Sequence, residues 1–245
     1  SVATFRDELI RQGHTVYVFA PQVWGYVDRE PGVFRYRALR VKYPVSASLA
    51  IPFSPSINRR ILGLGLDLIH SQHPVGLGNE AIRQARRCRV PLVFTYHSHY
   101  EVYVQSAPLG RRVLAAMARG VVRRYMAHCH RIITPTESAE RTIAERYPEL
   151  SSRLATLPTP IDTAAYRHLD PRPIRERYGL ARGLTFVVVA RLSVEKGVSE
   201  VIQAFAKATR GHVHAQLLIV GDGPRREHLV RQARALEIGE RVHFA

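Results

Sequence analysis

The chain lacks several features that would assign it to a class at once. Its 245 residues contain only two cysteines, Cys88 and Cys129, too few for a disulfide framework, which favours a reducing, cytosolic setting. No run approaches 18 consecutive apolar residues, so we expect no membrane-spanning helix. A charged start followed by an apolar core is also missing, so no signal peptide is indicated.

Familiar ligand-binding signatures are missing as well. The segments GLGLDL, GLGNEA and GDGPRR each lack the third glycine of a G-x-G-x-x-G loop, and no G-K-[S/T] occurs. The H-x-H pairs His97/His99, His128/His130 and His212/His214 have no third ligand nearby, so we expect no metal. A bound phosphate would therefore have to be held by side chains and helix ends.

Acidic residues are scarce, and the net charge is +16. Such an excess is compatible with nucleic acid, an anionic membrane surface or an anionic substrate. Only Lys42, Lys196 and Lys207 are lysines among the 36 basic residues, and the arginines are dispersed. No basic run is interleaved with aromatic residues, and no helix-turn-helix or zinc-finger pattern occurs. A nucleic-acid-binding protein is therefore only an alternative, and we expect no nucleic-acid partner.

Apolar strands alternate with amphipathic helices along the chain, which predicts parallel sheets joined by right-handed crossovers. We expect an α/β protein of two Rossmann-like domains, at 1–160 and 184–245. A proline-containing connection at 161–183 would join them. The expected strands include 15–21, a half-exposed strand at 32–43, 184–190, 215–220 and 241–244, and the expected helices include 198–209 and 224–237.

The two ends of the sequence indicate a fragment. The chain begins with serine inside a helix whose apolar face would hold Val2, Phe5, Leu9 and Ile10. It ends on the strand-like stretch RVHFA. We therefore expect that the first strand of domain 1 and the rest of domain 2 are absent, and that the fragment alone is inactive.

The stretch VVVARLSVEKG places two cations just after a buried strand. Arg191 stands at the strand end, and Lys196 precedes a helix whose residues 198, 201, 202 and 205 would face the sheet. Ligands of parallel sheets bind at this edge, and a helix amino terminus adds partial positive charge. The pattern predicts a diphosphate site. The alternative is a surface ion pair between Arg191 and Glu195 or Glu200.

A second strand end, in LLIVGDGPRREHL, supports the same site. Gly221 and Gly223 allow the backbone to approach a ligand, and Pro224 suits the first position of a helix. The alternative is a plain tight turn.

These two blocks together resemble the carboxyl-terminal half of family 4 retaining glycosyltransferases of the GT-B fold, with their G-R-L-x-x-E-K-G and G-x-G-P patterns. RDELIRQGHTVYVFAP is similar to the first helix and second strand of that family. The resemblance implies two domains facing a cleft that binds a nucleoside-diphosphate sugar, UDP- or GDP-linked. Arg191 and Lys196 would hold the diphosphate and stabilise charge on the leaving group.

The resemblance also implies roles in the first domain. His97 follows the strand PLVFTY, where a histidine of this family lines the sugar pocket; the alternative is a loop histidine that caps a backbone group. Thr136 is a predicted helix cap that would approach the phosphates. The family's usual account of retention needs no protein nucleophile, because a donor phosphate oxygen takes the acceptor proton.

The chain departs from the family pattern in three respects, of which the expected absence of the amino-terminal strand with its Gly-rich loop and of the E-x7-E segment concern activity. Ala190 stands where a glycine is common, and the E-x7-E segment that contacts the sugar and ribose would lie beyond residue 245. No D-x-D occurs, so a metal-dependent donor site is not indicated. A phosphorylase-like GT-B enzyme is the alternative activity.

A basic helix expected at 109–130 bears on the acceptor. Val113, Met117, Val121 and Tyr125 would form one stripe, with Arg112, Arg119 and Arg123 on another. This pattern favours docking at the inner face of the cell membrane, and the alternative is a core-packed helix with a solvated basic face. TYHSHYEVYVQ is similar to a tyrosine-rich stretch of diacylglycerol glucosyltransferases, which implies a lipid or saccharide acceptor.

Overall fold

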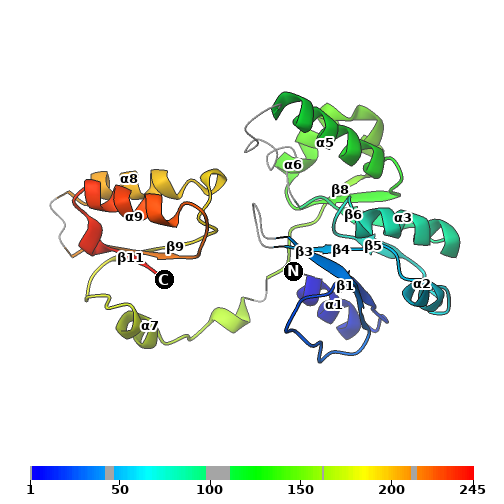
Figure 1. The fold of residues 1–245 in the computed structure, drawn as a ribbon, viewed down its shortest axis with the longest axis horizontal. Helices are drawn as coiled ribbons and strands as arrows, with labels where there is room; N and C mark the ends of the chain where they lie inside the picture. Colours follow the sequence, from blue (N-terminus) through cyan, green and yellow to red (C-terminus); the bar gives the residue numbers. More distant parts are fainter. Residues whose placement is uncertain (1, 42–46, 98–110, 162, 211–213) are drawn as a thin grey trace. The chain divides into compact units, whose positions relative to one another are not determined.

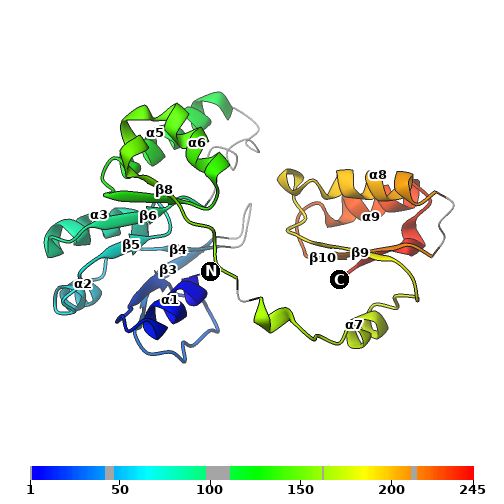
Figure 2. The ribbon, with the colours of Figure 1, turned by 180° about the vertical axis from the view of Figure 1, so that it is seen from behind.

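The computed structural model describes residues 2–41, 47–97, 111–161, 163–210 and 214–245. The chain divides into two compact units, Ser1–Asp162 and Thr163–Ala245 (Figures 1 and 2). The division falls at the start of the stretch expected to connect the domains. No helix in the described part of the chain has both the length and the apolar character needed to cross a bilayer.

Unit 1 is built around a parallel sheet with the strand order β5-β6-β7-β8, accompanied by a parallel pair β1-β2 and an antiparallel pair β3-β4. The strands are β1 (Val18–Pro21), β2 (Val33–Tyr36), β3 (Ala38–Val41), β4 (Ala47–Ala50), β5 (Ile69–Ser71), β6 (Leu92–Thr95), β7 (Arg131–Thr134) and β8 (Leu154–Thr156). The helices are α1 (Val2–Arg11), α2 (Pro55–Leu62), α3 (Leu77–Cys88), α5 (Arg111–Met126), α6 (Glu137–Arg146) and the 3-10 helix η1 (Pro148–Arg153). Helices lie between successive strands of the larger sheet, as the alternation predicts.

The prediction of a single strand at 32–43 is wrong, because the backbone changes its hydrogen-bonding partner strand in the middle of this stretch. The Tyr36 carbonyl accepts from the Gln22 N–H on the β1 side, whereas the next carbonyl, of Arg37, accepts from the Ile51 N–H after β4. The result is two short strands, β2 and β3, in different sheets. The period-two pattern indicated extended backbone correctly but not its pairing.

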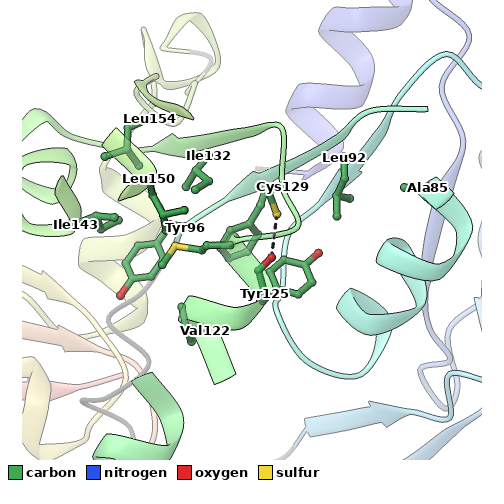
Figure 3. Close-up of a cluster of buried hydrophobic side chains, with 12 residues drawn as sticks. Ala85, Leu92, Tyr96, Val122, Tyr125, Cys129, Ile132, Ile143, Leu150 and Leu154 are labelled. Atoms are coloured by element: carbon green, nitrogen blue, oxygen red, sulfur yellow. Dashed lines mark hydrogen bonds between the residues drawn. The ribbon is translucent and has the colours of Figure 1, made fainter. Parts of the chain in front are cut away.

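The core of unit 1 is formed where side chains of the larger sheet pack against side chains of α3, α5 and α6 (Figure 3). Phe94 of β6 is fully buried, and its ring meets the Tyr125 ring edge-on at a centroid distance of 5.0 Å. Only the second half of α5 packs into this core, through Val122, Tyr125 and Met126. None of the described side chains at 112–121 is buried. Helix α5 therefore anchors at its carboxyl end and leaves its first turns exposed.

Unit 2 is a three-stranded parallel sheet with the order β11-β10-β9, covered on one face by two helices (Figures 1 and 2). Its elements are η2 (Ala164–Tyr166), α7 (Arg172–Arg177), β9 (Thr185–Val189), η3 (Val194–Lys196), α8 (Val198–Ala208), β10 (Gln216–Val220), α9 (Arg226–Ala235), η4 (Gly239–Arg241) and β11 (Val242–Phe244). The face predicted for α8 is confirmed, since Val198, Ile202 and Phe205 are buried against the sheet and Val201 packs beside them.

Candidate functional site

The segments that follow β9 and β10 form one edge of unit 2. Past the ends of the strands, the Leu192 N–H donates to the Asp222 carbonyl (2.9 Å), and the Arg225 N–H donates back to the Leu192 carbonyl (3.0 Å). These bonds extend the strand pairing into both loops. The structure therefore brings Arg191 and Lys196 onto the same edge as Gly221 and Gly223.

The two glycines are explained by this close approach of backbones. A Cβ on residue 221 would stand 2.0 Å from the Ala190 carbonyl oxygen, and one on residue 223 would stand 2.5 Å from that of Leu192. Neither distance is physically possible for a side chain without moving one loop away from the other. Both positions thus require glycine to keep the two loops in contact, whatever ligand they bind.

The side chains of Arg191 and Lys196 are exposed. Neither forms an ion pair in the described part of the chain, and so the alternative pairing with Glu195 or Glu200 is not observed. Glu195 instead accepts a hydrogen bond from the Ser193 hydroxyl (2.6 Å). This bond is the main reason why the pKa of Glu195 is lowered, and the charges of Arg191 and Lys196 lower it further. Two cations on one strand-end segment remain available to an anion.

A left-handed turn at Gly197 (φ 63°) joins η3, which ends at Lys196, to α8. The amino terminus of α8, with its partial positive charge, follows directly after the lysine. The expectation that Pro224 begins the next helix is wrong, because α9 begins two residues later at Arg226. The Arg225 N–H, bonded across to the Leu192 carbonyl, keeps this stretch as a turn.

In unit 1, His97 follows β6 and Thr136 follows β7, so both stand at the carboxyl edge of the larger sheet. Thr136 caps α6 as predicted, since its hydroxyl accepts from the Ala139 N–H at 3.1 Å. This bond uses one of the two acceptor lone pairs of the hydroxyl and does not use its proton.

His97 belongs to a hydrogen-bonded chain of polar side chains. Its Nε2 lies 2.5 Å from Gln72 Oε1, the Gln72 amide nitrogen lies 3.2 Å from His70 Nε2, and the Thr95 hydroxyl lies 2.7 Å from that same nitrogen. An amide nitrogen only donates, so His70 Nε2 accepts and the ring is neutral with its proton on Nδ1. His97 in turn donates from Nε2, and among the described residues its Nδ1 has no hydrogen-bond partner.

His70 and Gln72 were not singled out by the sequence patterns. The only available signal was the position of LDLIHSQH, a strand that ends in polar residues beside the strand preceding His97. Burial, and secondly the nearby His97 ring, lowers the pKa of His70 to about 4, and burial also lowers the pKa of His97. Both imidazoles are therefore neutral at pH 7.

Two of the histidine pairs considered for metal binding include residues outside the described ranges, namely His99 and His212. Most of the tyrosine-rich stretch after His97 also lies outside them. Within the described ranges, no group of three or more histidine, cysteine, aspartate or glutamate side chains is arranged to hold a metal ion.

Comparison with known families accounts for both units. The family model described as Glycosyltransferase Family 4 matches residues 1–165, about two thirds of the chain, and the model described as Glycosyl transferases group 1 matches residues 172–245. The chain belongs to glycosyltransferase family 4. The resemblance drawn from the strand-end motifs is thereby confirmed.

Individual relatives of this family 4 chain include lipid glycosyltransferases. An alpha-monoglucosyldiacylglycerol synthase of Streptococcus pneumoniae is 28% identical, aligned over 100% of this chain and 56% of its own length. A GDP-mannose-dependent alpha-(1-6)-phosphatidylinositol monomannoside mannosyltransferase of Mycolicibacterium smegmatis is 28% identical over 98% of this chain and 61% of its own length. The chain thus spans little more than half the length of these curated relatives.

The fold expectation is confirmed by solved structures. Anabaena HepE in complex with UDP-glucose superimposes with a TM-score of 0.60 at 18% identity, covering 87% of this chain and 55% of that one. Such neighbours are GT-B glycosyltransferases, so this family 4 chain has the α/β architecture of that fold.

The glycine at 221 gives a stability prediction. Gly221→Ala should lower the free energy of unfolding by about 2 kcal/mol or more, because the new methyl group forces the 190–192 and 221–225 loops apart. Gly120→Ala is the matched control, since residue 120 lies in α5 with open space around it, and should gain about 0.5–1 kcal/mol. Urea unfolding followed by circular dichroism measures both; equal stability of the two variants would contradict the close-approach argument.

The partly buried His70 gives a pH prediction. The unfolded chain protonates His70 near pH 6.5 and the folded chain only near pH 4, so the unfolded state binds more protons between these values and stability falls as the pH drops. Between pH 7 and pH 5 the loss from His70 should be about 2 kcal/mol. Urea unfolding at both pH values should show a smaller loss of stability for His70→Gln than for the unmodified chain, and equal losses would count against a neutral His70 in the folded chain.

Proposed function

We propose that the chain is the larger part of a retaining glycosyltransferase that moves a sugar from a nucleoside-diphosphate donor to a lipid or glycan acceptor. The observation that carries the proposal is the cationic strand end of unit 2, where Arg191 and Lys196 are exposed and form no ion pair in the described part of the chain. Family membership supports it, as does the similarity to HepE, which was solved with UDP-glucose.

The donor diphosphate would bind at this edge. The Arg191 guanidinium presents paired donors that suit two phosphate oxygens, and Lys196 adds a point charge beside the amino terminus of α8. As the bond between the sugar and the diphosphate breaks, negative charge grows on the leaving group, and these cations stabilise it. Retention is then explained by a donor phosphate oxygen that takes the acceptor proton, without a protein nucleophile.

His97 is the proposed sugar-pocket residue. Because its Nε2–H faces Gln72, its neutral Nδ1 is the nitrogen left to accept a hydrogen bond from a sugar hydroxyl. The chain through Gln72 and His70 holds the ring in this tautomer, so a positioning role for His70 follows from the same geometry.

Donor binding is testable on this chain with UDP and GDP in isothermal titration calorimetry. Lys196→Ala should weaken binding of the accepted nucleotide by at least about tenfold, as expected for the loss of a bond to a charged group. Lys207→Ala removes the same charge from the far end of α8, at an exposed position, and should bind like the unmodified chain. If the two variants bind equally well, Lys196 does not hold the diphosphate.

The acceptor side is proposed to meet a membrane through α5. Val113, Met117 and Val121 form a stripe in which 64%, 63% and 49% of each residue is exposed. The expected fourth member, Tyr125, is buried in the core and does not belong to the stripe. A core-packed stripe was the alternative, and for these three residues it is not observed. An exposed apolar stripe flanked by arginines is typical of helices that lie in an anionic bilayer interface.

The relatives named above act on diacylglycerol- and phosphatidylinositol-linked substrates according to their names. This agrees with a lipid acceptor for the present chain and with peripheral contact at the cytoplasmic face of a membrane.

Membrane docking is testable by pelleting with vesicles. The chain should sediment with phosphatidylglycerol vesicles and much less with phosphatidylcholine vesicles. Val113→Asp with Met117→Asp should abolish most of the sedimentation, because both charges fall on the exposed stripe. Leu169→Asp, an equally exposed apolar residue of unit 2, should leave it unchanged. Equal sedimentation with phosphatidylglycerol and phosphatidylcholine vesicles would exclude α5 as the docking surface. Unchanged sedimentation of the double variant would exclude it as well.

A further inference from the structure

A cavity of about 760 Å³ opens at the amino-terminal edge of the larger sheet of unit 1. It is formed where the chain enters three strands: the turn after α3 that leads into β6, the turn after α5 that leads into β7, and the residue before β8. His97 and Thr136 follow the carboxyl ends of two of these strands, β6 and β7, so the cavity lies on the opposite edge from the proposed sugar pocket.

The described residues that line the cavity carry charge of one sign. Arg86, Arg89 and Arg153 contribute guanidinium groups, His128 and His130 contribute imidazoles, and none of these described lining residues is acidic. None of the three arginines forms an ion pair with a carboxylate in the described part of the chain. The carboxyl ends of α3 and α5 offset about half a charge each, which leaves roughly two positive charges uncompensated.

The hydrogen bonds around the two imidazoles determine which ring nitrogen of each carries the proton and acts as a donor. Arg86 Nη2 lies 3.2 Å from His128 Nδ1, and since a guanidinium only donates, this ring nitrogen accepts. The Leu92 N–H likewise donates to His130 Nδ1 at 3.1 Å. Each neutral ring therefore carries its proton on Nε2, as a donor that no other described bond uses.

Arg153 has a structural role that uses only one nitrogen of its guanidinium group. Its Nη1 donates to the carbonyls of Ala127 (2.9 Å) and Cys129 (3.1 Å) and so holds the turn after α5 in place. Arg89 has no such role: its backbone is left-handed (φ 56°) at the end of α3, and its side chain is exposed. Arg86 and Arg89 thus carry charge that the packing does not require.

We propose that this cavity is a second anion site of the chain, which binds a phosphate group through Arg86, Arg89 and the imidazole N–H donors of His128 and His130. A phosphate monoester anion carries nearly two charges and several acceptor oxygens, which matches the uncompensated charge and the surplus of donors. The phosphate could belong to a soluble ester or to the headgroup of an anionic lipid. The site is independent of the proposed sugar transfer, because it uses neither Arg191 nor Lys196.

Binding should be visible in the histidine rings. The pKa of His128 is lowered by burial and secondly by Arg86 and Arg124, and a bound phosphate would oppose that effect. The test is proton–nitrogen NMR of the ring resonances of the 245-residue chain carrying Lys196→Ala, which removes a cation from the proposed donor site. His128→Gln and His130→Gln spectra assign the two rings, and inorganic phosphate is titrated at constant ionic strength.

We expect the signals of His128 and His130 to move and saturate as phosphate is added. Arg86→Gln with Arg89→Gln should weaken this binding by at least about tenfold, because two charge-assisted bonds are lost. The matched control is Arg59→Gln with Arg87→Gln. Both arginines are exposed and lie outside the cavity, so this double substitution should change the affinity for phosphate little.

A second arm distinguishes the source of the phosphate by titrating small vesicles that contain phosphatidic acid, a phosphate monoester, against phosphatidylcholine vesicles and recording the same variants. A response to inorganic phosphate supports a soluble ligand, and a response to phosphatidic acid alone supports a lipid headgroup. Ring signals that respond to neither ligand would overturn the proposal, even if a variant failed to fold, because that result comes from the unsubstituted cavity. Equal responses in the two double variants would overturn it as well.

Discussion

The interlocking of two loops past the ends of β9 and β10 is the constraint on which the proposed donor site depends. Backbone bonds between Leu192 and the 222–225 turn hold the loops together, and they form only because positions 221 and 223 have no side chain. This arrangement keeps Arg191 and the start of α8 beside the second loop. A cation on a freely moving loop would lose conformational entropy on binding an anion, whereas the backbone of this segment is already ordered.

The two edges of the larger sheet in unit 1 carry different kinds of polar side chain. At the carboxyl edge, neutral imidazoles and an amide form a relay of hydrogen bonds that ends at His97, which suits recognition of sugar hydroxyls. At the amino edge, arginines converge without carboxylates, which suits an anion. The two edges differ because different parts of the chain form them. Loops that follow the strands form the carboxyl edge, where ligands of parallel sheets bind. Turns that follow the carboxyl ends of helices form the amino edge, and the negative end of a helix dipole favours arginine there.

Helix α5 connects these features to the membrane proposal. Its carboxyl half is held by the core through Val122, Tyr125 and Met126, so its exposed first turns project from a fixed base. The turn that follows it supplies His128 and His130 to the amino-edge cavity. A single helix thus carries both the apolar stripe and the start of the anion site, on opposite ends of its length.

Sequence alone determined the alternation of strands and helices, the strand-end positions of Arg191, Lys196, Gly221 and Gly223, and the family, because these are properties of short contiguous stretches. The tertiary structure alone decided what depends on contacts between distant stretches. It divided 32–43 between two sheets, showed that Gly221 is needed against Ala190, linked His97 to His70 through Gln72, and separated Tyr125 from the exposed stripe of α5. Periodicity indicates which residues share a face, but only packing determines what that face meets.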